Sequence, residues 1–152
     1  MSGPVPGAVP GRRVVVDGTD VTAEPMELSI GTAAAQIFDV WATGGAGTPD
    51  GPPAGAWSLV PPDGGTVWRF AAFLPGQVGD DPRAGMHATP TVDYGLVLSG
   101  TIALVLADGR EVPLRAGDAF VLRGAQHTWA NHGDTTCVIS FVLVHHPEAA
   151  EG

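Results

Sequence analysis

Two segments in the second half of the chain decide the fold: GMHATPTVDYGLVLSG at residues 85–100 and GDAFVLRGAQHTWAN at residues 117–131. Each is an apolar, β-like run punctuated by glycine, and each contains a single histidine, His87 in the first and His127 in the second. Such runs can place a histidine on the inner wall of a barrel, where an imidazole can bind a metal ion or move a proton.

The spacing within both segments resembles the two signature motifs of the cupin family. The first cupin motif reads His-x-His, three or four residues, Glu, six residues and Gly, and its positions are taken here by His87, Asp93 and Gly100. The second motif is a Gly-Asp turn, an apolar strand, a small-residue turn and His-x-x-x-Asn. Its positions are taken here by Gly117, Asp118, Gly124, His127 and Asn131. The run PPDGGTVWRF at residues 61–70 also resembles the lead-in strand of small single-domain cupins.

The chain departs from the family pattern at positions that bear on chemistry. Thr89 stands where the motif has its second histidine, and Asp93 is shorter by one methylene than the usual glutamate. The proline usual before the second histidine turn is missing, and Arg123 stands nearby. A complete family set would be three histidines and one carboxylate, whereas these positions offer His87, Asp93 and His127. Two histidines and one carboxylate still form a recognised open-site arrangement for Fe(II).

Length and composition favour one all-β domain. The chain has 152 residues, of which 36 are Gly or Pro, and its apolar runs argue against disorder. Many short strands joined by Gly/Pro turns predict an antiparallel β-barrel or jelly roll, and the resemblance implies the cupin type. We expect a flexible tail at residues 1–11, the barrel domain at 12–146 and a frayed tail at 147–152.

Hydrophobic patterning places several of the strands. Strands are expected at 13–16, 36–42, 66–74 and 136–144, the last of them buried on both sides. Asp108-Gly109 between two apolar runs predicts a hairpin. Residues 26–35 are the one weak candidate for a helix.

Charge and residue usage exclude several classes of function. The net charge is −9, and all seven basic residues are arginines. The sequence therefore lacks the basic footprint of a nucleic-acid-binding protein and the polybasic patch of a membrane-surface protein, so neither partner is expected. The absence of lysine rules out a Schiff base on a side chain.

The cysteine count and the first residues bear on the compartment. Cys137 stands alone and cannot form an internal disulfide, so a reducing, cytoplasmic setting is expected. The first residues do not resemble a signal peptide, and no apolar run approaches the ~20 residues that span a bilayer.

The spacing of polar residues predicts a site inside the barrel. On an extended strand, side chains two apart share a face, so His87, Thr89, Thr91 and Asp93 should project to one side unless Pro90 introduces a bulge. His127 and Trp129 form the same kind of pair on the second strand. We therefore predict His87, Asp93 and His127 as the catalytic residues and metal ligands. A hydrogen-bonded core histidine or, for Asp93, a turn role is the alternative.

Four further residues are predicted to contact the substrate. Thr89 and Trp129 share a face with the proposed ligands, and Tyr94 adjoins Asp93. Arg69, if it points inward, would bind a carboxylate, and otherwise it would lie at the rim. The remaining histidines, His132, His145 and His146, are expected on the surface.

These residues predict a metal-dependent cupin enzyme that acts on a small, largely apolar metabolite of secondary metabolism. One divalent metal ion, with Fe, Mn, Ni and Zn all open, would act as a Lewis acid in decarboxylation, dehydration, isomerisation or cyclisation. An Fe(II) dioxygenase and a non-catalytic small-molecule-binding cupin are the alternatives, and a barrel that has lost its metal and packs on a partner is a third. A homodimer is also expected, because the strand at 13–16 could pair with a neighbour.

Overall fold

The computed structural model describes residues 11–45, 50–53, 56–76 and 85–151, so the expected N-terminal tail lies outside the described residues apart from Gly11. All regular elements within these ranges are β-strands except one short 3-10 helix. This confirms the all-β architecture expected from the Gly/Pro-punctuated apolar runs. No helix among the described residues has the length and apolarity needed to cross a membrane.

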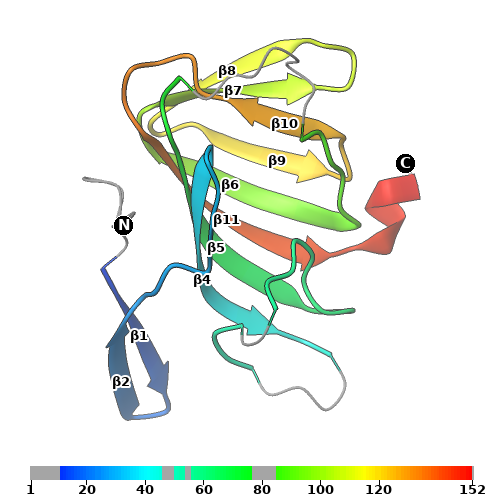
Figure 1. The fold of residues 1–152 in the computed structure, drawn as a ribbon. Helices are drawn as coiled ribbons and strands as arrows, with labels where there is room; N and C mark the ends of the chain where they lie inside the picture. The colour runs from blue at the N-terminus through cyan, green and yellow to red at the C-terminus, as the bar shows by residue number, and fades with distance from the viewer. Residues whose placement is uncertain (1–10, 46–49, 54–55, 77–84, 152) are drawn as a thin grey trace.

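The larger sheet has six strands and curves around the interior of the molecule (Figure 1). All of its neighbouring strands pair antiparallel. In spatial order it contains β3 (Ile30–Gly31), β4 (Ala35–Thr43), β5 (Thr66–Phe73), β11 (Cys137–His145), β6 (Thr91–Ser99) and β9 (Ala119–Arg123).

A second sheet of three antiparallel strands completes the wall, and a separate hairpin stands away from it (Figure 1). The three-stranded sheet has the order β10 (His127–Ala130), β7 (Thr101–Leu106) and β8 (Glu111–Arg115). The hairpin consists of β1 (Arg12–Asp17) and β2 (Asp20–Pro25).

The hydrophobic core lies between the two sheets and confirms the alternating pattern read from the sequence. Its buried centre combines Val97 and Ile139 of the larger sheet with Ile102 of the smaller one and Cys137. Aromatic side chains from both sheets pack against this centre: Phe73, Phe120, Trp129 and Phe141. Burial raises the pKa of the Cys137 thiol to about 11, which keeps that thiol protonated.

Three local expectations meet different outcomes. The Asp108-Gly109 turn joins β7 to β8, with Gly109 at a φ of 87°, as the hairpin signal predicted. Residues 26–35 form no helix and instead contain β3, because their apolar residues pair with β4. Within the expected tail at 147–152, the structure has the 3-10 helix η1 (Pro147–Glu151), where Ala149 is buried; just before it, His146 N–H donates to Pro90 O at 2.7 Å.

The last strand, β11, is only partly as expected. It is hydrogen-bonded on both sides, to β5 and β6, so it is a central strand. Its inner face is buried at Cys137, Ile139 and Leu143, but Ser140 and Val142 on the outer face are half-buried. The apolar run therefore reflects central pairing more than burial of both faces.

Gly95 on β6 provides a test of this packing. It lies opposite Phe120 of β9, and a Cβ built on Gly95 would collide with the Phe120 ring. That ring is also packed edge-on against Trp129, with centroids 5.3 Å apart, so it has little freedom to move. We expect Gly95→Ala to lower the free energy of unfolding by about 1–3 kcal/mol, the cost of overpacking, measured by chemical denaturation. Gly11→Ala, where nothing lies within 4 Å, is the matched control; equal stability of both variants would contradict this account.

The β1–β2 hairpin bears on the expected homodimer, which stays a prediction. Val14, Val16 and Val21 on the hairpin are 49%, 63% and 63% exposed, and an isolated two-stranded hairpin is marginally stable. We expect light scattering of the full chain to give twice the chain mass, and Val16→Ser with Val21→Ser to shift it toward monomer. Thr22→Ser on β2 is the control. A monomer at micromolar concentration without any substitution would count against the dimer.

Candidate functional site

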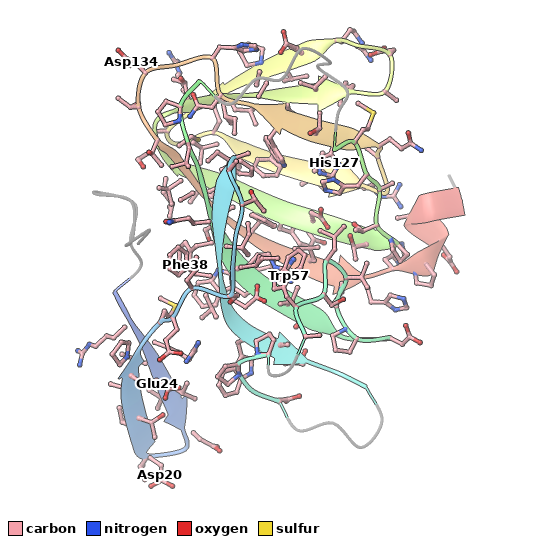
Figure 2. The ribbon with its side chains drawn as sticks, in the orientation of Figure 1. Asp20, Glu24, Phe38, Trp57, His127 and Asp134 are labelled. Carbon is pink, nitrogen blue, oxygen red and sulfur yellow. The ribbon has the colours of Figure 1, made fainter. Side chains whose placement is uncertain are left out.

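The two motif histidines are brought together by the backbone. His87 N–H donates to His127 O at 3.0 Å and His127 N–H donates to His87 O at 2.9 Å, so the two residues form an isolated antiparallel bridge. Their imidazole centroids are 4.6 Å apart, with the rings tilted by 58°. His127 opens β10 and lies on the inner side of the sheets, as Figure 2 shows.

Hydrogen bonds to the backbone define the tautomer of both imidazoles. Nδ1 of His87 lies 2.9 Å from Gly85 O, and Nδ1 of His127 lies 2.8 Å from Ala125 O. A carbonyl oxygen can only accept, so each Nδ1 carries a proton, and Nε2 is the ring nitrogen that can present a lone pair. Burial lowers the pKa of His127, and the nearby His87 lowers it further, which together outweigh the hydrogen bond to Ala125 O.

The first motif places three hydroxyl and carboxyl groups in a line. Pro90 precedes β6 rather than interrupting it, so Thr89, Thr91 and Asp93 share one face as the spacing predicted. Thr91 Oγ1 donates to Asp93 Oδ1 at 2.6 Å, and Thr89 Oγ1 lies 2.5 Å from Thr91 Oγ1. All three side chains are buried. Burial raises the pKa of Asp93, against the lowering effects of the Thr91 hydrogen bond and of Arg69 and His87.

These groups line a small, mostly apolar cavity of about 130 Å³ between the sheets. His87, Thr89, Asp93 and His127 form its polar part. The apolar part comes from five aromatic residues, Trp57, Phe73, Phe120, Trp129 and Phe141, and from Ile37, Leu59, Leu122 and Leu143. Larger surface hollows lie elsewhere, but they are not lined by either motif histidine. A mostly apolar pocket with a few convergent polar groups is typical of a small-molecule site.

Arg69 points inward, and its guanidinium is already engaged by the protein. Its Nη1 donates to Leu59 O and its Nη2 to Ser58 O, both at 3.1 Å, while Nε lies 2.9 Å from Asp39 Oδ1. The Nε–H does not point at this oxygen, so the contact is an ion pair rather than a hydrogen bond. The guanidinium also stacks over Trp57 at 5.1 Å. Arg69 therefore holds the segment that carries Trp57 over the cavity, which is not the carboxylate-binding role expected of it.

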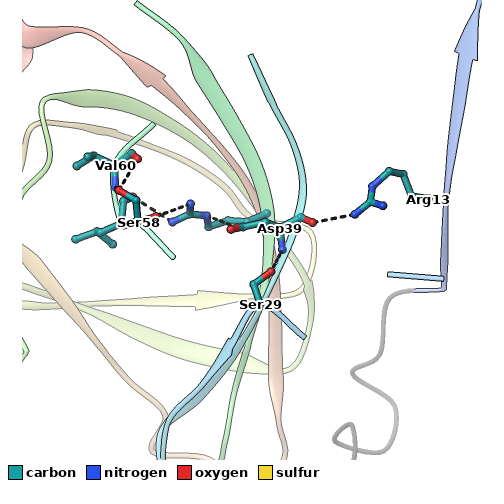
Figure 3. A network of polar contacts seen from close by, with 7 residues as sticks. Arg13, Ser29, Asp39, Ser58 and Val60 are labelled. Carbon is teal, nitrogen blue, oxygen red and sulfur yellow. Dashed lines mark hydrogen bonds and ion pairs between the residues drawn. The ribbon is translucent and has the colours of Figure 1, made fainter. Parts of the chain in front are cut away.

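The Asp39–Arg69 pair belongs to a buried polar network that reaches the N-terminal hairpin (Figure 3). Arg13 Nη2 donates to Asp39 O at 3.2 Å, and Asp39 N–H donates to Ser29 Oγ at 2.9 Å. Burial raises the pKa of Asp39 although Arg69 opposes the shift, and burial lowers the pKa of Arg69, which as an arginine remains charged.

Some of the other predicted residues line the cavity and others do not. Trp129 lines the cavity, in agreement with its parity with His127. Tyr94 does not, because neighbouring residues on β6 face opposite sides and Tyr94 is 55% exposed on the outer one. His132 is on the surface beside Glu111, but His145 is half-buried and accepts a hydrogen bond from Gly64 N–H at 2.8 Å, so its surface assignment was wrong.

Sequence reasoning missed three residues of the site. Thr91 shares the parity of Thr89 and Asp93, and that signal was available. Trp57 lies in a Gly/Pro-rich stretch whose conformation the sequence does not specify (Figure 2). Asp39 pairs with Arg69 through the register of β4 and β5, which the sequence does not indicate.

His87 and His127 are the two residues whose side chains could hold a metal ion. Both Nε2 lone pairs are available, and each Nδ1–H is fixed by a carbonyl, which is the usual support of a metal-bound histidine. Within the described ranges, no three His, Cys, Asp or Glu side chains gather closely enough to hold one ion. Asp93 lines the same cavity without completing such a group, so its role as a third ligand stays a prediction.

Comparison with known proteins agrees with this fold. Residues 72–145 match the family model described as a cupin domain. The chain is 42% identical over 72 residues to phomopsin biosynthesis cluster protein C′ of Diaporthe leptostromiformis, an alignment covering 47% of this chain and 35% of that protein. It is 36% identical over 67 residues to the cupin-domain-containing oxidoreductase fogC of Aspergillus ruber, covering 44% of this chain and 30% of that protein. The chain thus spans about a third of the length of these curated relatives.

A solved structure extends the agreement beyond the matched motifs. The polyketide cyclase RemF from Streptomyces resistomycificus superimposes with a TM-score of 0.50 at 19% identity, covering 75% of this chain and 67% of that one. At this identity the likeness bears on the fold alone. The family match, which spans both histidine motifs, shows that residues 72–145 form a cupin domain.

Proposed function

We propose that this protein is an enzyme of secondary metabolism that performs acid–base chemistry of the lyase or isomerase type on a small, largely apolar metabolite. The observation that carries the proposal is the convergence of two imidazoles and a buried carboxyl group in one aromatic-lined cavity. The names of the relatives, which include a biosynthesis cluster protein and a cupin-domain oxidoreductase, support the metabolic setting.

The side chains suggest a division of roles in proton transfer. While no metal ion occupies its Nε2, His127 suits a general base, because burial disfavours its charged form and its Nδ1 is held by Ala125 O. Asp93 suits a general acid, because burial favours its protonated form. The aromatic wall excludes water from the reacting centre, which strengthens both interactions.

His87 and His127 are the residues that would hold one divalent metal ion. When bound, such an ion would supply Lewis-acid stabilisation of an oxygen that gains negative charge. The donor set alone does not choose among Fe, Mn, Ni and Zn. If the ion is Fe(II), a dioxygenase is the second candidate function. The relatives named cupin-domain-containing oxidoreductases support this alternative. A non-catalytic binding protein would use the same cavity without turnover.

The reaction class can be read from the mass change that the protein causes. Native protein and His127→Ala would each be incubated with a metabolite extract and compared by mass spectrometry. Loss of water or carbon dioxide, or a new isomer of unchanged mass, formed by the native protein alone would support the proposal. Gain of two oxygen atoms would support the dioxygenase instead. No difference between native protein and variant would leave the binding protein as the better account.

Metal content tests the histidine pair directly. We expect His127→Ala to lose the ion while the fold, checked by circular dichroism, survives, because an open site of this kind does not hold the domain together. Asp93→Asn should lose less of the bound metal than His127→Ala, since a carboxamide oxygen can still coordinate the ion. Thr89→His should bind the ion more tightly if its added imidazole reaches it. The measurement is elemental analysis of untagged protein with His132→Ala as the control; full metal content in His127→Ala would sink the assignment.

The buried carboxyl group should also affect stability. Because the pKa of Asp93 is raised in the folded state, its contribution to stability is fully present below the unfolded pKa and is lost as pH rises through the folded pKa. Asp93→Asn should therefore raise the free energy of unfolding at pH 7, and the gain should shrink as pH falls toward the ordinary aspartate value of 3.8. Chemical denaturation at both pH values is the measurement.

Asp108→Asn is the contrasting control for this experiment. Hydrogen bonds from Arg110 lower the pKa of the exposed Asp108, so its replacement should give no gain at pH 7. An Asp93→Asn variant that is less stable than the native protein at pH 7 would contradict the assignment.

A further inference from the structure

The polar end of the cavity, formed by His87, Thr89 and His127, presents acceptor atoms to whatever occupies it. Both imidazoles donate from Nδ1 to backbone carbonyls, which leaves the Nε2 lone pairs free. Thr91 has one hydroxyl hydrogen and gives it to Asp93. The Thr89 hydroxyl must then donate to Thr91, so Thr89 Oγ1 can only accept further hydrogen bonds. We define these three residues as the acceptor end.

Arg69, the cationic side chain that lines the cavity, is not free to bind an anionic ligand group. Arg69 is buried, and its three nitrogens contact Leu59 O, Ser58 O and Asp39 Oδ1. An anionic ligand group would therefore meet the lone pairs of the acceptor end without a compensating positive charge. Burying an unpaired charge in such a place is costly, which selects against carboxylates.

The size and lining of the cavity limit the rest of the ligand. An apolar cavity of about 150 Å³ accommodates benzene, and the cavity here has about 130 Å³ and five aromatic residues in its wall. Flat rings pack well against aromatic side chains in offset or edge-to-face geometry. Because the cavity here is slightly smaller than the one that accommodates benzene, it limits the ligand to at most one six-membered ring.

We propose that the cavity, when no metal ion occupies the Nε2 atoms of His87 and His127, binds a single-ring phenol or cyclic enol through its un-ionised hydroxyl group, which donates to the acceptor end, and that it rejects carboxylates of the same size. This inference rests on the proposed function in taking the cavity as the substrate site. It adds the chemical class of the reacting end of the substrate. It also replaces the carboxylate recognition that Arg69 was expected to provide.

The test compares probes of equal size on the full chain after removal of metal with a chelator. Phenol, toluene and benzoate would be titrated at pH 7 by calorimetry and ligand-observed NMR. We expect phenol to bind at least about tenfold more tightly than toluene, because a site built to receive a hydroxyl leaves its polar groups unpaired with the methyl analogue. Benzoate should show no binding. Toluene or benzoate binding as tightly as phenol would overturn the proposal.

Variants assign the preference to the acceptor end. His127→Phe keeps a ring but removes the lone pair, and it should bring the phenol-to-toluene ratio close to one. His132→Phe on the surface is the matched control. Thr89→Val should lower phenol affinity by about three- to tenfold, the worth of one hydrogen bond, whereas Thr89→Ser should retain it. If His127→Phe fails to fold, the Thr89 pair carries the test, and unchanged phenol binding in Thr89→Val would then overturn the proposal.

Failure of this inference is distinguishable from failure of the proposed function. Phenol binding that appears only after metal is restored would overturn the acceptor-end proposal and would still support a metal site on the histidines. Phenol selectivity without conversion of any metabolite would support the acceptor end and would argue against an enzyme.

Discussion

The reciprocal backbone hydrogen bonds between His87 and His127 are the constraint on which the site depends. They join two segments that are far apart in the chain, and they set the separation of the imidazoles before any side-chain packing is considered. Each ring is then oriented by a carbonyl two residues earlier, Gly85 O for one and Ala125 O for the other. The two motifs thus use the same local device, and the pair of free Nε2 atoms follows from backbone geometry.

Sequence reasoning recovered those parts of the fold that depend on short-range periodicity. The alternation leading into β6 and along it places Thr89 and Asp93 on one face. The same rule puts Tyr94 on the opposite face, although it was predicted to contact the substrate because it adjoins Asp93. The spacing of the second motif placed Trp129 in the cavity wall. The partners of Arg69 could not be predicted, because Asp39, Ser58 and Leu59 reach it through strand register and an irregular segment. The pairing of residues that are distant in the chain is not indicated by any local sequence pattern.

The buried ion pair shows how the cavity is shaped at an energetic cost. Arg69 and Asp39 are both removed from water. Desolvation raises the pKa of Asp39 and lowers the pKa of Arg69, which in each case disfavours the charged form. In return, one guanidinium orients the Trp57 ring and two carbonyls of the 58–59 segment. A hydrophobic residue at position 69 could fill the volume but could not satisfy these carbonyls. The pair is therefore better understood as a support of the cavity wall than as a source of stability.

The position of β11 has a consequence for how the chain folds during synthesis. It is the last strand in chain order among the described residues, yet it occupies the middle of the larger sheet, between β5 and β6. Until residues 137–145 have left the ribosome, β5 and β6 lack the strand that joins them and expose unpaired edges. Pairing between distant segments is slow, and exposed edges invite association with other chains. The nascent domain therefore depends on β11 to close the sheet, so a ribosome that stalls before residues 137–145 have emerged would leave an aggregation-prone intermediate.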